Sequence, residues 1–111
     1  MIEFEVIEKP PYKQSYASRN EQTNQEIYKE SLKNEARNLM ITKSIQMITK
    51  ENVKLMIRYE RANGRMDSAN IIGGIADTLE GIVFVNDNQI KEIHYIENKG
   101  DKDKYKVKIE V

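Results

Sequence analysis

Apolar and polar residues alternate along several stretches of the chain, as in β-strands that bury one face. The alternation is regular in residues 2–7, 52–60 and 104–111, where every second position is Val, Ile, Leu, Phe or Tyr. Successive side chains of a strand point to opposite faces, so these segments predict three half-buried strands. Residues 90–97 predict a fourth strand with less regular alternation. The polar residues 98–103 predict a hairpin loop joining it to the last strand.

A period of three to four residues marks a long helix in the first half of the chain. The apolar positions with this spacing are Tyr28, Leu32, Ala36 and Leu39. Thr23 precedes Glu26 by the three residues of a capping box, which predicts a helix from there to about Met40. Residues 41–50 either extend this helix or form a separate segment. Three Ile residues keep the helical period there, but two Thr residues disfavour it.

A second helix is predicted over residues 68–80. Asp67 or the following serine is its expected N-cap, because a side-chain oxygen there can accept a hydrogen bond from a free amide of the first turn. Gly81 is expected to end it. The pair Gly73 and Gly74 interrupts it, and each Gly costs about 1 kcal/mol relative to Ala in a helix interior. The pair therefore indicates close approach of another backbone or of a partner helix.

The element order β-α-β-α-β-β predicts an α+β fold, a two-layer arrangement in which a four-stranded mixed sheet packs against two main helices. With 111 residues, the chain is expected to form a single domain spanning residues 1–111. It contains no Cys and one His, which excludes a disulfide framework and argues strongly against a zinc site.

The charge balance and the N-terminus narrow the functional classes only slightly. The chain has 18 Lys and Arg residues and 18 Asp and Glu residues, and this zero net charge argues neither for nor against nucleic-acid binding. The N-terminal residues lack the basic segment and long apolar run of a signal peptide, and no apolar run approaches bilayer length. We therefore expect a cytoplasmic protein with no membrane association.

Three carboxylates are the main candidates for chemistry. Asp67 starts the second predicted helix, Asp77 lies on that helix, and Asp87 lies in the polar turn after it. Carboxylates at a helix start and in a nearby turn can converge on one oxygen-lined site for a divalent metal. The alternative is that they are only helix caps and turn formers, because Asp is common at both kinds of position.

Basic residues occur in two loops and at one strand end. Lys13 and Arg19 lie beside Tyr12 and Tyr16 in the polar segment after the first strand, and this combination suits an arm that contacts a nucleic-acid backbone. Three further cations, which suit a phosphate-bearing substrate because guanidinium pairs well with phosphate oxygens, are Arg58, Arg61 and Arg65. The alternative for both groups is an ordinary solvated surface.

The stretch from Asp67 to Ile90 resembles the RusA-type Holliday-junction resolvases. The resemblance rests on several elements in a fixed order: an Asp, an Asn three residues later, an Asp-x-Leu on the helix, a Gly, a short apolar run, and an Asp before a Gln and an aliphatic residue. In this chain these are Asp67, Asn70, Asp77-Thr78-Leu79, Gly81, residues 82–85, and Asp87-Asn88-Gln89-Ile90. More loosely, the resemblance covers the whole chain.

The resemblance implies a small dimeric endonuclease, often encoded by a phage or prophage, that nicks four-way DNA junctions with Mg²⁺ or Mn²⁺. Asp67 and Asp87 are then the metal ligands, and Asp77 is an auxiliary ligand or a structural carboxylate. The expected DNA contacts are Lys13, Arg19, Arg58, Arg61, Arg65 and Asn70. A homodimer suits this activity, because a four-way junction offers two equivalent strands to cut.

Three positions depart from the family pattern. Ala69 stands where the family has a second acidic residue, Gly73 where it has a catalytic Lys, and Asn86 where it often has another acidic residue. A poorer ligand set is expected to bind metal more weakly. One hypothesis is therefore an enzyme with a rebuilt site that uses Asp77 or Glu80. The others are a catalytically impaired relative that binds branched DNA or a protein without cleaving, and a plain α+β interaction module.

Overall fold

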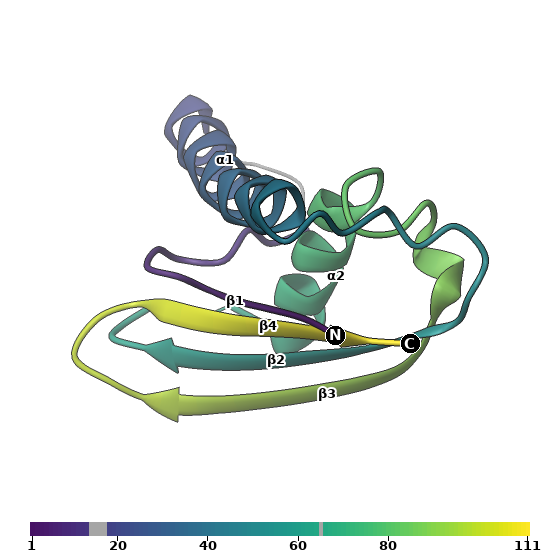
Figure 1. The fold of residues 1–111 in the computed structure, drawn as a ribbon. Helices are drawn as coiled ribbons and strands as arrows, with labels where there is room; N and C mark the ends of the chain where they lie inside the picture. The colour runs from purple at the N-terminus through teal and green to yellow at the C-terminus, as the bar shows by residue number, and fades with distance from the viewer. Residues whose placement is uncertain (14–17, 65) are drawn as a thin grey trace.

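The computed structural model describes residues 1–13, 18–64 and 66–111. It confirms the order β-α-β-α-β-β and the mixed four-stranded sheet (Figure 1). Its elements are the strands β1 (Ile2–Val6), β2 (Val53–Arg61), β3 (Ile90–Lys99) and β4 (Lys104–Glu110), the helices α1 (Arg19–Thr42) and α2 (Ser68–Leu79), and the 3₁₀ turn η1 (Asp87–Gln89). Neither described helix is long and apolar enough to cross a bilayer.

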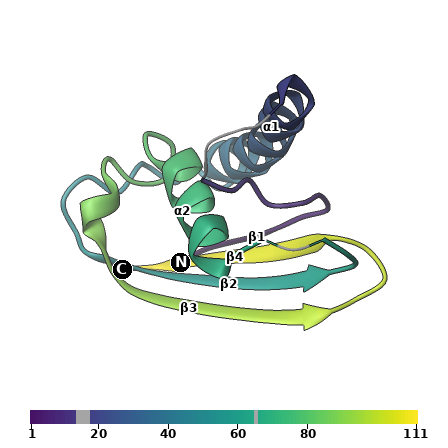
Figure 2. The ribbon, with the colours of Figure 1, turned by 180° about the vertical axis from the view of Figure 1, so that it is seen from behind.

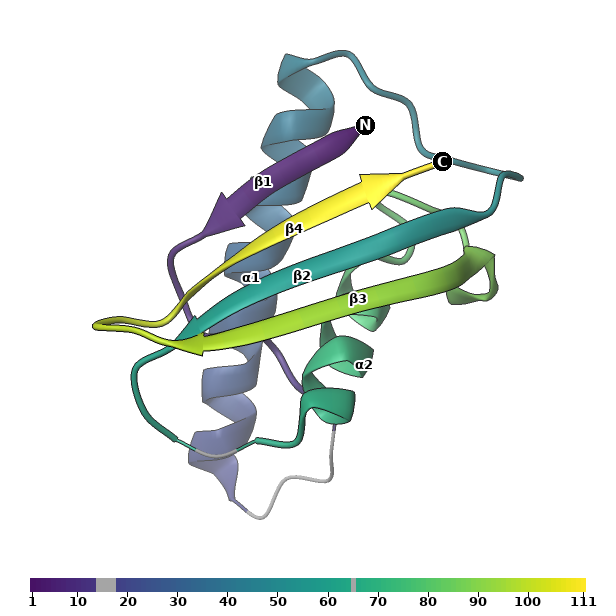
Figure 3. The same ribbon diagram turned by 90° about the horizontal axis from the view of Figure 1, so that it is seen from below.

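Both helices lie on one face of the sheet, and seen from below the sheet lies in front of them (Figure 3). The alternating apolar residues of β1, β2 and β4 face the helices and form the core. Leu55, Val107 and Ile109 have exposed fractions of 0%, 0% and 1%. The helix α2 lies between α1 and the turn η1, as the views from front and back agree (Figures 1 and 2). The fold is thus a two-layer structure with one open sheet face.

The strand order β1-β4-β2-β3 corrects the predicted hairpin between β3 and β4. The strand β4 is antiparallel to both β1 and β2, whereas β3 is parallel to β2 and forms the edge. The connection therefore crosses the end of β2, where the Gly100 amide donates to the Arg61 carbonyl at 3.0 Å. Hydrophobicity explains the order, because the regularly alternating β4 buries every second residue, while the weakly patterned β3 is largely exposed at the edge.

The helix α1 begins before its predicted start. Its N-cap is Ser18, whose side chain accepts a hydrogen bond from the Glu21 amide at 3.2 Å. Thr23 instead lies inside the helix, where its hydroxyl donates to the Arg19 carbonyl at 3.0 Å. The capping-box prediction was therefore wrong. The helix ends at Thr42, so most of residues 41–50 form a separate, non-helical segment.

The glycine pair of α2 is explained by the loop after β1. A Cβ atom built on Gly74 would lie 2.6 Å from the Tyr12 Cα atom and would also strike the Pro11 carbonyl. Gly74 thus permits the close approach of another backbone, one of the two alternatives that the sequence left open. Because the chain's own loop occupies this surface, Gly74 does not mark a helix contact between two copies.

Candidate metal and DNA site

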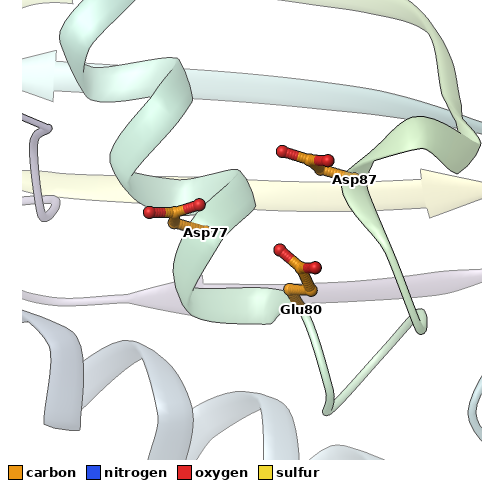
Figure 4. A group of neighbouring side chains, drawn as sticks. All are labelled: Asp77, Glu80 and Asp87. Carbon is orange, nitrogen blue, oxygen red and sulfur yellow. The ribbon is translucent and has the colours of Figure 1, made fainter.

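Three carboxylates converge at the end of α2. Asp77 lies in its last turns, Glu80 is its C-cap, and Asp87 is the first residue of η1 (Figure 4). One carboxylate oxygen from each lies within 4.8 Å of the others. Asp77 and Asp87 are exposed and Glu80 is partly buried. We call these three residues the acidic cluster.

The turn between Glu80 and Asp87 brings η1 back to the end of α2. Gly81 adopts a φ of 85°, a left-handed conformation that favours glycine, and its amide donates to the Phe84 carbonyl at 2.7 Å. Val83 and Phe84 have exposed fractions of 0%, so their burial anchors the short segment in the core. The chain therefore folds back tightly enough for Asp87 to lie opposite Asp77 and Glu80.

Gln89 fixes the turn that carries Asp87. This residue is 8% exposed. Its side-chain amide makes four hydrogen bonds of 2.9 to 3.1 Å, with the backbones of Val85, Asn86, Ile48 and Glu51. These bonds tie η1 to the segment before β2. Gln89 was part of the motif in the sequence, but its positioning role depends on partners about 40 residues away and was not predicted.

Replacing Gln89 with Leu is expected to loosen this turn. The substitution keeps the side-chain volume but leaves four buried or partly buried backbone groups without their partner, which should lower the free energy of unfolding by about 2 kcal/mol or more. It should also weaken Mn²⁺ binding because Asp87 is no longer held. Urea unfolding and Mn²⁺ titration measure both effects. Asn88→Ala, which removes an exposed side chain from the same turn, is the matched control.

Asp67 lies at the other end of α2. It is the N-cap, as predicted, and its side chain accepts a hydrogen bond from the Ala69 amide at 3.3 Å. Ten residues of helix separate it from Asp77, which corresponds to about 15 Å. The structure therefore brings Asp77 and Asp87 together but does not bring Asp67 to them. Glu80, considered from the sequence only as a substitute ligand, completes the group.

The predicted DNA-contacting residues fall on different surfaces. Lys13, in the loop after β1, packs against α2, and its ammonium is 3.8 Å from the Asp77 Oδ1 atom. Arg19 is exposed at the start of α1. Asn70 lies on α2, where its side-chain amide donates to the sulfur of Met66 at 3.8 Å. Arg58 is exposed on β2, on the opposite sheet face from its buried neighbours. Arg65 and Tyr16 lie outside the described residues.

Arg61 is engaged in a structural ion pair. Its guanidinium makes two 2.9 Å hydrogen bonds to the Glu97 carboxylate, donates to the Met66 carbonyl at 3.0 Å and lies over the Tyr59 ring. Tyr95 adds a 2.6 Å hydrogen bond to the same carboxylate. The hydrogen bonds from Arg61 lower the pKa of Glu97, and the carboxylate in turn raises the pKa of Arg61. The contact to Met66 holds the loop that leads into α2.

Arg61→Ala is therefore expected to act on stability. It removes three hydrogen bonds made by a charged group and should lower the free energy of unfolding by about 1.5–3 kcal/mol. Arg58→Ala, an exposed arginine on the same strand, should stay within about 0.5 kcal/mol of the original chain. Urea unfolding of both variants measures this difference. An Arg61 variant with unchanged stability and weaker junction binding would instead support the phosphate contact predicted from the sequence.

The donor set of the acidic cluster fits a hard divalent cation. Mg²⁺ and Mn²⁺ prefer carboxylate oxygens, and the cluster offers three carboxylates and no nitrogen or sulfur ligand. One oxygen of each of the three carboxylates lies within 4.8 Å of the others, so all three side chains would be able to share one divalent cation.

The sequence comparison identifies the family of this chain. Residues 8–111 match the family described as endodeoxyribonuclease RusA, so the match includes both helices, three of the four strands and all three cluster residues. A search of curated proteins finds no match. RusA nucleases are Holliday-junction resolvases. Because the family match covers nearly the whole chain, the protein belongs to the RusA endodeoxyribonuclease family.

Proposed function

We propose that this protein is a divalent-metal-dependent endonuclease that cleaves four-way DNA junctions, with Mg²⁺ or Mn²⁺ held by the acidic cluster. The observation that carries the proposal is the convergence of Asp77, Glu80 and Asp87 from two elements in a chain of the RusA family. Glu80 supplies a third carboxylate where the sequence lacks the family's second acidic residue at Ala69. The proposal thus takes Asp77 and Asp87 as ligands and leaves Asp67 as a helix cap.

Each protein group has a distinct task in this proposal. The three carboxylates bind the cation, Gln89 orients Asp87, and the Gly81 turn sets the distance between the helix and η1. When bound, a divalent cation supplies Lewis-acid stabilisation of the negative charge on the phosphate and favours attack by water. The exposure of Asp77 and Asp87 leaves the cluster open to a DNA backbone approaching from solvent.

Junction binding is proposed to use Lys13 and Arg19 rather than the whole set predicted from the sequence. Lys13 lies beside the acidic cluster, and Arg19 is exposed at the start of α1. Arg58 faces the opposite side of the sheet, and Arg61 is occupied by Glu97. Phosphate contacts release counterions, so junction affinity should fall with salt. A homodimer remains part of the proposal because it would present two such sites to the two equivalent strands of a junction.

A second candidate function is junction binding without cleavage. Ala69 and Gly73 favour it, because both stand at positions where the family carries a functional side chain. The acidic cluster favours the enzyme, because a pure binder has no need for three negative charges beside a DNA contact surface. The two candidates share the fold and differ in whether a strand is cut.

An end-labelled four-way junction with Mg²⁺ or Mn²⁺ separates the candidates. A retarded band on a native gel together with symmetric nicks on a denaturing gel supports the enzyme. Retardation without nicks supports the binder, and neither result supports a plain interaction module. Linear duplex DNA of the same sequence is the control for junction selectivity, and excess EDTA should abolish nicking but not retardation. Sedimentation at high protein concentration tests the dimer.

A further inference from the structure

Lys13 follows one face of α2 from its middle toward the acidic cluster. Its backbone amide donates to the Asn70 carbonyl at 2.9 Å. Its side chain then crosses Gly73, where an added Cβ atom would lie 3.4 Å from the Lys13 Cδ atom and 3.5 Å from its Cβ atom. Its ammonium ends 3.8 Å from the Asp77 Oδ1 atom. The three contact points on α2 are three and four residues apart, so they share one helix face.

The charges of this arrangement balance a divalent cation. The acidic cluster carries three negative charges and Lys13 one positive charge, which leaves two negative charges. Among the residues that the structure describes, Lys13 is the one cation paired with the cluster. The pair is open to solvent, with side-chain exposures of 64% and 51%, so it contributes little to stability. Its ammonium is therefore free to exchange the carboxylate for a phosphate oxygen.

Resting on the proposed function, we propose that Lys13 is the catalytic cation of the site and that Gly73 provides the slot through which its side chain reaches there. The ammonium contacts the phosphate that is cut and stabilises the negative charge that develops on its oxygens. Any long side chain at position 73 would occupy the same surface of α2. Gly73, which has no side chain, thus leaves room for the Lys13 side chain to reach the acidic cluster.

The first test compares Lys13→Ala and Lys13→Arg with Lys102→Ala, which removes an exposed lysine from the loop between β3 and β4. Lys13→Ala should lower kcat for junction nicking about 100-fold. It should leave the melting temperature unchanged and should not weaken Mn²⁺ binding measured without DNA, because it removes a positive charge from beside Asp77. Lys13→Arg should recover part of the rate, and Lys102→Ala should behave like the original chain.

The second test moves the lysine from position 13 to position 73. In the double variant Lys13→Ala with Gly73→Lys, the new side chain starts four residues before Asp77 on the same helix face and can reach the same carboxylate. It should restore nicking at least about tenfold over Lys13→Ala, because a charge at this place is worth a factor of that order or more. The matched control, Lys13→Ala with Gly73→Met, adds a long uncharged side chain and should restore nothing.

The outcomes separate this inference from the proposed function. If the original chain nicks the junction with neither Mg²⁺ nor Mn²⁺, the proposed function is refuted, and the role of Lys13 with it. Nicking by the original chain that persists in Lys13→Ala overturns the inference alone. Loss of nicking together with a lower melting temperature or weaker Mn²⁺ binding also overturns it, because Lys13 is then a structural residue. A folded lysine-swap variant no more active than its methionine control overturns it as well.

Discussion

Asp77→Asn and Asp87→Asn are each expected to reduce junction nicking roughly 100-fold or more while the chain stays folded and retards the junction on a gel. Each substitution keeps the side-chain shape but replaces a charged ligand with a neutral amide, which a hard cation binds less well. Mn²⁺ affinity should fall in parallel. Single-turnover nicking assays and Mn²⁺ titration of the same preparations measure the two effects. Glu80→Gln should show the same pattern, because Glu80 is the third member of the acidic cluster.

Asp67→Asn is the matched control for the metal titration. Asn caps a helix about as well as Asp, and position 67 lies about 15 Å along the helix from Asp77. Its Mn²⁺ affinity should therefore equal that of the original chain. Weaker binding in Asp67→Asn with normal binding in Asp77→Asn would place the cation at the start of α2, as the family resemblance implied from the sequence.

Gly74→Ala is expected to destabilise the chain by about 2 kcal/mol, although alanine favours helices by about 1 kcal/mol. The added Cβ atom meets the backbone of Pro11 and Tyr12, which cannot move aside like the end of a flexible side chain. For a chain of this size the melting temperature should fall by roughly 10 °C. Thermal unfolding followed by circular dichroism measures the change.

Gly73→Ala provides the contrast one residue away. Its added Cβ atom meets only the Lys13 side chain, at 3.4 and 3.5 Å, so the gain in helix propensity should dominate. The melting temperature of this variant should rise or stay the same. Equal falls in the melting temperature of both variants would mean that α2 itself requires glycine, and that the contact between the loop and the helix does not explain it. No change at Gly74 would show that the loop between Pro11 and Lys13 does not press on the helix.

The strands and the second helix could be predicted because their signals are local. Alternation in β1, β2 and β4 reports burial directly, and Asp67 and Gly81 mark the ends of α2 with their own side chain and backbone. The partner of each strand is a different matter. The order β1-β4-β2-β3 depends on how much apolar surface each strand buries relative to the others. This cannot be judged from one short stretch of sequence.

The acidic cluster was only partly predictable for a similar reason. Asp77 and Glu80 are three residues apart, so helix geometry alone places them on one side. Their meeting with Asp87 requires the Gly81 turn and the four hydrogen bonds of Gln89, two of which go to a distant segment. The resemblance paired Asp87 with Asp67 as metal ligands and gave Asp77 only an auxiliary role. Once the helix is built, Asp67 lies at the wrong end of α2 for this group.

The position of β4 inside the sheet has a consequence for how the chain acquires its structure during synthesis. This strand pairs with β1 on one side and with β2 on the other, and Ile2 faces Ile109 in the register. Contacts between segments so distant in sequence form slowly, because a long loop must close first. Until residues 104–110 have been synthesised, β1 has no partner strand, and the helices cover an incomplete core. A nascent chain of this protein should therefore remain open to proteases and to chaperones until β4 emerges.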